Sequence, residues 1–213
     1  NVWFNPNDGY TWAGEGQVSS IYTRGGVGKG IGADVASGKW YANMVSLKAA
    51  ASSGVYTLSA DMWHGFETAG SWTIAKLYDT VNSKVFDLQW GAGNLEVASD
   101  FPFTDGTPII TIPYYLGWMH AEAYIDLTNK TVQIAYFNPY GEQEGVSVLK
   151  HYSVAFAPNQ VGASSYANFY QPQKEGVDNL SFAPGSKPQT DTFWDKYDGY
   201  TDGNLSGQLA PNG

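Results

Sequence analysis

Residues 117–136 read GWMHAEAYIDLTNKTVQIAY, and they carry the clearest structural signal in the chain. Polar residues alternate with small or apolar ones over residues 118–127, and the alternation resumes over residues 131–137. A period of two is typical of strands that bury one face. The intervening Thr128-Asn129-Lys130 favours a turn, so the stretch predicts an antiparallel hairpin. The first strand is then expected to carry a row of polar side chains on one face, namely His120, Glu122, Tyr124 and Asp126.

The same alternation extends from this hairpin in both directions. The residues DTVNS at positions 79–83 favour a second turn between two strands. The further expected strands span residues 17–23, 39–48, 55–62, 72–78, 84–90, 145–156, 164–171 and 176–183. About a dozen short strands without a helical period predict an all-β fold, either a sandwich or a barrel. The residues expected to be buried in its core are Tyr56, Leu58, Phe86, Leu88, Ile125, Val132 and Ile134.

The composition fits an all-β protein and excludes several kinds of partner. Of 213 residues, 25 are Gly, and aromatic residues make up 15% of the chain. Glycine and aromatic residues are poor helix formers, which argues against a helical bundle. The formal net charge is -9, so the chain lacks the excess of Lys and Arg with which proteins bind nucleic-acid phosphates. We therefore expect no nucleic-acid partner, and we expect a polyanionic substrate to be disfavoured.

Several features favour a location outside the cell. The chain contains no Cys, which excludes disulfides and thiolate metal sites. No apolar run approaches the ~18 residues of a membrane-spanning helix, so no membrane span is expected. The sequence starts at Asn1 rather than Met, as expected for the mature part of an exported protein. We expect a secreted, extracellular protein, and a trimmed domain of a cytoplasmic protein is the alternative.

Two segments depart from the alternation. Residues 25–32 read GGVGKGIG, but they lack the Gly-Lys-Ser/Thr ending of a phosphate-binding loop, so we expect a flexible surface loop. Residues 184–188 read PGSKP, which is a linker composition, and an aromatic, acidic tail follows them. The tail contains DGYT at residues 198–201, which repeats DGYT at residues 8–11. The repeat favours ends that pack together or that self-associate with a neighbouring chain.

The hairpin resembles the central hairpin of laminin G-like domains, in the concanavalin A-like lectin/glucanase superfamily. In those domains a Trp-x-His start, a strand that ends in Asp, a short turn and a Thr-Val-x-Ile strand recur, as at Trp118, His120, Asp126 and residues 131–134 here. Residues 37–41, 55–61 and 177–182 are similar to other strands of the family, so the resemblance covers residues 17–184. It implies a jelly roll, an antiparallel β-sandwich of two stacked sheets, over residues 1–185. Residues 186–213 would then be a linker and an extended C-terminal tail.

The resemblance implies glycan or protein binding more often than catalysis. A sugar stacks its apolar face on an aromatic ring, while carboxylates and amides bind its hydroxyl groups. The residues expected to contact a ligand therefore combine an aromatic ring with polar groups on strands: Trp63, Asp87, Gln89, His120, Glu122, Tyr124 and Gln133.

Catalysis is an alternative use of the same polar row. His120 and Tyr124, beside Glu122, would suit proton abstraction next to a uronate carboxylate, as in some jelly-roll polysaccharide lyases. Those enzymes usually pair a Gln-x-His strand with an Arg-rich one, but Gln133-Ile134-Ala135 lacks the His, and Arg24 is the single Arg of the chain. A retaining glycosidase needs two carboxylates about 5–5.5 Å apart, and residues 142–144, EQE, offer such a pair. Their flanks favour a turn, which argues against catalysis there.

Calcium is the expected cofactor. The tail places several hard oxygen ligands close together, with Gly199 and Gly203 allowing sharp turns between them. The alternative is that these side chains cap turns. The candidate calcium ligands are Asp195, Asp198 and Asp202 in the tail and Asn5, Asn7 and Asp8 at the other end.

These observations predict a secreted, non-catalytic, lectin-like protein whose partner is a glycan or polysaccharide. The first alternative is a structural subunit of an extracellular filament, sheath or surface layer that assembles through its termini. The second alternative is a jelly-roll polysaccharide lyase or glycoside hydrolase.

Overall fold

The structure is a computed structural model, and it describes residues 17–19, 24, 30–35, 39–64, 72–98, 101–112, 117–167, 173–185, 193–195 and 203–204. These residues form two antiparallel β-sheets and no α-helix. Within these ranges, no helix has the length and hydrophobicity that crossing a bilayer requires. The predicted all-β class is therefore confirmed.

The larger sheet contains ten strands among the described residues. Its order is β11 (Gln143–Val146), β10 (Thr131–Phe137), β9 (Gly117–Asp126), β4 (Val55–His64), β14 (Gln173–Pro184), β2 (Gly30–Val35), β1 (Gln17–Ser19) and β16 (Gly203–Asn204). In addition, β12 (Lys150–His151) pairs with β10, and β15 (Phe193–Asp195) pairs with β14. The predicted hairpin forms as β9 and β10, and β4 lies on the other side of β9.

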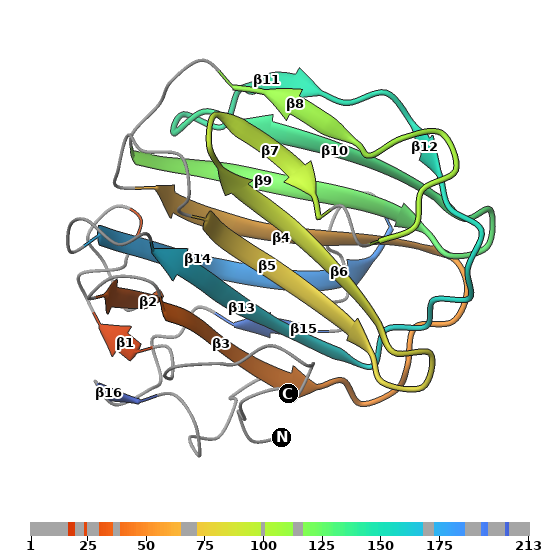
Figure 1. Cartoon of the computed structure of the whole chain (residues 1–213), viewed down its shortest axis with the longest axis horizontal. Helices are drawn as coiled ribbons and strands as arrows, with labels where there is room; N and C mark the ends of the chain where they lie inside the picture. The colour runs from red at the N-terminus through yellow and green to blue at the C-terminus, as the bar shows by residue number, and fades with distance from the viewer. Residues whose placement is uncertain are drawn as a thin grey trace.

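The smaller sheet contains six strands among the described residues. Its order is β3 (Lys39–Ser46), β13 (Gln160–Ala167), β5 (Trp72–Asp79), β6 (Lys84–Gly91), β7 (Asn94–Val97) and β8 (Ile109–Thr111). Figure 1 shows this sheet stacked against the larger one, with β5 and β6 in front of β4 and β9. The two layers form the jelly-roll β-sandwich that the sequence predicts.

The core lies between the two sheets and is built from every second side chain of the strands. Of the seven residues predicted to be buried, Tyr56 is partly buried, and its ring stacks on Phe182 with a centroid distance of 5.0 Å. The other six have no exposed surface: Leu58, Phe86, Leu88, Ile125, Val132 and Ile134. The core prediction is therefore confirmed, and the alternate side chains of the same strands must face away from the core.

Two turns are closed by the same arrangement of an Asp and an Asn. Asp126 Oδ1 accepts hydrogen bonds from the backbone N–H of Thr128 and Asn129, at 2.9 and 2.8 Å, and Oδ2 accepts one from Asn129 Nδ2 at 2.7 Å. Asp79 accepts the corresponding bonds from Val81 and Asn82, at 3.0, 3.0 and 2.6 Å. Side chains of this kind satisfy the backbone of a turn locally, which is why both predicted turns form.

Two expectations about individual elements are wrong, and two short strands were not expected. A single strand over residues 145–156 does not form, because the chain leaves the sheet between β11 and β12, where Val148 is 74% exposed. The glycine-rich segment does not remain a loop throughout, since β2 begins at Gly30 and Gly32 pairs with Gln17 and with Gly176. The sequence pattern also fails to predict β7 and β8, because strands of four and three residues are too short for alternation to be recognised.

Part of the C-terminal tail pairs with the larger sheet. Residues 193–195 form β15, in which Trp194 pairs with Ser181 of β14. Residues 203–204 form β16, in which Asn204 pairs with Gln17 of β1. The backbone of these two tail segments is therefore hydrogen-bonded within the same chain.

Candidate functional site

The candidate site lies on the outer face of the larger sheet, where β4 and β9 run side by side. The register places Asp61 opposite His120 and Trp63 opposite Trp118. Met62 and Met119, the neighbours of these residues, are buried in the core. Because successive side chains of a strand point to opposite faces, the polar row of β9 and the side chain of Asp61 share the outer face.

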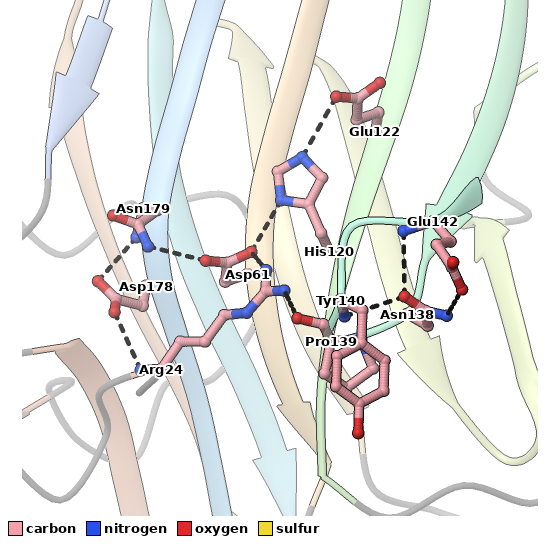
Figure 2. A network of polar contacts seen from close by, with 10 residues as sticks. All are labelled: Arg24, Asp61, His120, Glu122, Asn138, Pro139, Tyr140, Glu142, Asp178 and Asn179. Carbon is pink, nitrogen blue, oxygen red and sulfur yellow. Dashed lines mark hydrogen bonds and ion pairs between the residues drawn. The ribbon is translucent and has the colours of Figure 1, made fainter. Parts of the chain in front are cut away.

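Asp61 is the centre of a network of polar contacts (Figure 2). Asp61 is only 4% exposed, and its carboxylate accepts three hydrogen bonds. Oδ1 accepts from His120 Nδ1 at 2.8 Å and from the Arg24 guanidinium at 2.5 Å, while Oδ2 accepts from Asn179 Nδ2 at 2.7 Å. Burial alone would raise the pKa of Asp61, but the bonds and charges of His120, Asn179 and Arg24 outweigh burial and hold this pKa below its ordinary value. Asp61 is therefore an anion at neutral pH.

His120 is held between two carboxylates. Its Nδ1 faces Asp61, and its Nε2 lies 3.2 Å from Glu122 Oε1. Burial alone would lower the pKa of His120, but hydrogen bonds to Asp61 and Glu122, together with their charges, raise the pKa to about 9. An imidazole with that pKa is protonated at neutral pH, and then both ring nitrogens donate.

Tyr124 extends the network along β9. Its hydroxyl donates a hydrogen bond to Glu122 Oε2, the carboxylate oxygen that does not face His120. Burial, followed by the hydrogen bond and charge of Glu122, raises the pKa of Tyr124. The phenol is therefore neutral at physiological pH and acts as a donor.

Arg24 joins three separate elements at the site. Its guanidinium donates to Asp61 of β4 and, at 2.9 Å, to the carbonyl oxygen of Pro139 in the turn after β10. Its backbone N–H donates to Asp178 Oδ2 of β14 at 3.1 Å. A β-irregularity between residues 178 and 181, with Asn179 at a φ of 50°, presents both Asp178 and Asn179 to the network. Figure 2 shows Arg24 reaching across β14 and β4 towards Pro139.

Aromatic rings lie beside the polar network. The Trp63 and Trp118 rings pack edge to face, with centroids 5.4 Å apart, two register steps from the Asp61–His120 pair. The Phe137 ring of β10 lies 5.6 Å from the His120 ring. The indole N–H of Trp63 has no hydrogen-bond partner among the described residues. The outer face thus combines partly buried rings with charged donors and acceptors.

The structure brings together five of the seven residues predicted to contact a ligand. These are Trp63, His120, Glu122, Tyr124 and also Gln133, which pairs with Tyr124 across β9 and β10. Asp87 and Gln89 belong to β6 of the smaller sheet. There Asp87 forms an ion pair with the buried Lys76 at 3.5 Å, and Gln89 donates to Glu96 at 2.7 Å. Their core neighbours are Phe86, Leu88 and Trp90, so both residues face away from the sandwich on the side opposite His120.

The other candidate residues separate into two groups. Glu142 and Glu144 both accept hydrogen bonds from Asn138 Nδ2, at 3.0 Å each, on an exposed turn, as the flanking sequence predicts. The side chains of the six candidate calcium ligands, Asn5, Asn7, Asp8, Asp195, Asp198 and Asp202, lie outside the described residues. Within the part of the chain that is described, no group of three or more His, Asp or Glu residues could hold a metal ion.

Four residues of the network are absent from the sequence-based candidates: Arg24, Asp61, Asp178 and Asn179. Asp61 could have been suspected, because the alternation in residues 55–62 places it on the polar face of its strand. Arg24 gives no such signal, since nothing in its surroundings indicates that its side chain reaches β4.

No protein-family model matches the sequence, and no curated protein matches it. Among solved structures, the chain is similar to the catalytic domain of a glycoside hydrolase family 131 protein from Coprinopsis cinerea, with a TM-score of 0.55 and 12% identity over 80% of this chain and 78% of that one. It is also similar to the carbohydrate recognition domain of Emp47p, with a TM-score of 0.54 and 9% identity over 73% and 83% of the two chains. Peanut lectin gives a TM-score of 0.51 and 12% identity over 83% and 94%.

These likenesses define the fold as a concanavalin A-like jelly roll, the fold shared by lectins and by some glycoside hydrolases. The finer resemblance to laminin G-like domains stays a prediction.

Proposed function

We propose that this protein is a secreted, non-catalytic carbohydrate-binding protein that holds its glycan on the outer face of the larger sheet. The observation that carries the proposal is the network in which His120 is held between Asp61 and Glu122, with Tyr124 and Trp63 on the same face. The glycan would lie along β4 and β9, with one sugar ring against Trp63.

The network suits the recognition of sugar hydroxyl groups. A hydroxyl group both donates and accepts, so it needs acceptors and donors close together. Glu122 supplies acceptor oxygens, and the Arg24 guanidinium has five N–H donors, of which the bonds to Asp61 and Pro139 use two. The N–H groups of His120 and the O–H of Tyr124 hold Asp61 and Glu122 in place, and the Tyr124 oxygen can still accept. The side chain of His120 is 26% exposed and that of Glu122 is 17% exposed, so a ligand can reach both. The internal bonds fix these groups in place, which reduces the entropy lost when a ligand binds.

The protonation states favour binding over cleavage. A general base or acid works best when its pKa lies near the operating pH. His120, with a pKa of about 9, is already protonated and cannot accept a proton, and the raised pKa of Tyr124 opposes formation of a phenolate. Asp61, with its lowered pKa, holds no proton to give. The proton abstraction expected of a lyase therefore lacks a base in His120 or Tyr124.

The charge of the site favours a neutral glycan. Two cations, Arg24 and His120, face three carboxylates, those of Asp61, Glu122 and Asp178. The cations are thus already paired, and the whole chain carries a formal net charge of -9. A polyuronate would have to displace these carboxylates and would also be repelled at long range.

The named functions of similar structures support a glycan as the partner. Those with this fold include a carbohydrate recognition domain, peanut lectin and the CBM2 module of a phage protein. They also include catalytic domains of glycoside hydrolase family 131, so hydrolysis is the alternative that an experiment must address.

The test is a glycan array followed by titration of the strongest ligand against the protein and three variants. We expect Glu122→Gln and Tyr124→Phe to weaken binding about 10- to 100-fold, because each removes part of a charge-assisted hydrogen-bond network. Gln89→Ala is the matched control, since it removes a partly buried hydrogen bond on the opposite sheet. Binding that is unaffected by the first two variants would exclude this site. New reducing ends or unsaturated products from the bound glycan would show that the protein is an enzyme.

A further inference from the structure

A pocket of about 330 Å³ lies next to the polar network, at the turn that follows β10. The turn lies between the polar network and the pocket. The Pro139 carbonyl accepts a hydrogen bond from Arg24 of the network, and Pro139 also lines the pocket. Phe137 likewise lines the pocket and packs against His120. Residues 137–139 therefore join the two features, although Met119 and Tyr136 of the pocket lie on the core side of their strands and His120 lies on the outer side.

Most of the pocket surface is apolar. Ile112, Met119, Phe137 and Pro139 provide aliphatic, thioether and aromatic walls. Asn138 also lines the pocket, but its amide is already used: Nδ2 donates to Glu142 and Glu144, and Oδ1 accepts from the backbone N–H of Tyr140 and Glu142. These bonds fix the turn, so the pocket is held open by the fold rather than formed by a ligand.

Besides Asn138 and Tyr140, two further polar side chains line the pocket. Glu144 adds a carboxylate, and Tyr136 adds a phenol whose pKa is raised by burial and then by the charge of Glu144. Tyr136 lies flat against β11 because residue 145 is Gly; a Cβ there would come within 2.4 Å of the Tyr136 ring. The pocket thus offers one anionic acceptor and one neutral hydroxyl within an apolar surface.

We propose that this pocket binds the acetamido group of an N-acetylated amino sugar beside Tyr140, in a glycan chain that continues around the turn to the His120 site. The inference rests on the proposed glycan binding and names the sugar class. The methyl group of the acetamido would contact the apolar walls, its N–H would donate to Glu144, and its carbonyl would accept from Tyr136. Tyr140, which is 89% exposed at the same turn, stands at the pocket rim.

Other sugar substituents fit the pocket less well. A bare pyranose ring would bring several hydroxyl groups into a surface that has few free partners, and unpaired buried polar groups are costly. A carboxylate, sulfate or phosphate would face Glu144 and be repelled. An acetamido group has one donor, one acceptor and a methyl group, which is the combination that the walls can satisfy.

The test compares two ligands that differ only at this group: chitohexaose, which carries an acetamido group on each ring, and cellohexaose, which carries a hydroxyl group instead. We expect calorimetric titration to give at least about tenfold tighter binding of chitohexaose, the discrimination of one well-fitted small group. Equal affinities, lost together in Glu122→Gln, would overturn the pocket assignment and leave the proposed function standing. No binding of any glycan on the array would remove the proposed function and this inference together.

Two variants locate the preference within the pocket. Ile112→Phe fills the pocket, and Tyr136→Phe removes one hydroxyl while keeping the ring on Gly145, so both should reduce the chitohexaose preference to threefold or less. Val148→Phe, at a residue that is 74% exposed and outside the pocket lining, is the matched control and should keep the preference. Thermal melting of each variant checks that it is folded. A preference that survives both pocket variants overturns the assignment, even if Ile112→Phe alone lowers stability.

Discussion

At the scale of a single residue, the neighbours of His120 set its charge, and its charge decides whether it acts as a hydrogen-bond donor or as a base. A solvent-exposed histidine has a pKa near 6.5 and is mostly neutral at pH 7.5. Between Asp61 and Glu122 the pKa of His120 rises to about 9, so the ring is a cation over the physiological range. The same carboxylates that make it a fixed donor remove it as a base.

This raised pKa predicts how stability depends on pH. A group whose pKa is higher in the folded state stabilises the fold fully below its unfolded pKa, and the contribution is lost as pH rises through the folded pKa. For His120 the loss should therefore run from about pH 6.5 to about pH 9, and it should amount to roughly 3 kcal/mol at most, at 1.36 kcal/mol per unit. Urea unfolding of the protein and of His120→Gln at pH 6, 7.5 and 9.5 measures the difference. We expect that difference to shrink with rising pH, and an NMR titration that places the imidazole pKa at 6.5 or below would contradict the network.

At the scale of the structural element, two turns that are closed in the same way by an Asp side chain contribute differently to the stability of the fold. Asp126 and Asp79 each accept three hydrogen bonds from their own turn. Asp79 also accepts from the backbone N–H of Ala157 at 2.7 Å and has no exposed surface, whereas Asp126 is partly exposed. The Asp79 turn thus also fixes a distant segment of the chain.

We therefore expect unequal costs for the same substitution. Asp126→Ala should lower the free energy of unfolding by about 1 kcal/mol, the value of a local side-chain cap. Asp79→Ala should cost about 3 kcal/mol, because it also leaves the partly buried backbone N–H of Ala157 unpaired. Chemical denaturation of both variants at pH 7 measures the two values. Equal losses would mean that the bond to Ala157 adds nothing to stability.

At the scale of the whole molecule, two segments of the C-terminal tail, residues 193–195 and 203–204, are part of the larger sheet. β15 pairs with β14 and β16 pairs with β1, so the backbones of these two segments are hydrogen-bonded to strands of the same chain. The tail also contains three of the proposed calcium ligands, Asp195, Asp198 and Asp202. Calcium binding and assembly through the termini stay predictions, and both can be examined by removing the tail.

If calcium binds the tail, it should stabilise the full chain and not a variant that lacks residues 188–213. An ion that binds only the folded state adds RT ln(1 + [L]/Kd), about 2.7 kcal/mol at a hundredfold excess over Kd. The measurement is thermal melting of both proteins in EDTA and in millimolar calcium, with size-exclusion chromatography of the same samples. An unchanged midpoint of the full chain would exclude the site, and a tail-dependent oligomer would support the structural alternative.

The alternation of polar and apolar residues along the chain was sufficient to predict much of the fold. Alternation in residues 118–137 predicted both strands of the hairpin and the face of each side chain, because a strand's period of two is a property of neighbouring residues. Asp and Asn in the turns were equally local signals, and the polar row of His120, Glu122 and Tyr124 followed from the alternation. Segments with weak alternation, such as residues 145–156, were predicted poorly for the same reason.

The assembled site depends on long-range pairing, which no local pattern encodes. Alternation placed Asp61 and Asp87 alike on the outer faces of their strands, but only the order of strands puts β4 beside β9 and β6 in the other sheet. Arg24 lies 37 residues from Asp61 and 115 from Pro139, and it contacts both. Which strands pair is decided by how all apolar faces are buried together in one core, so the charge of His120 and the neighbouring pocket emerge only in the folded chain.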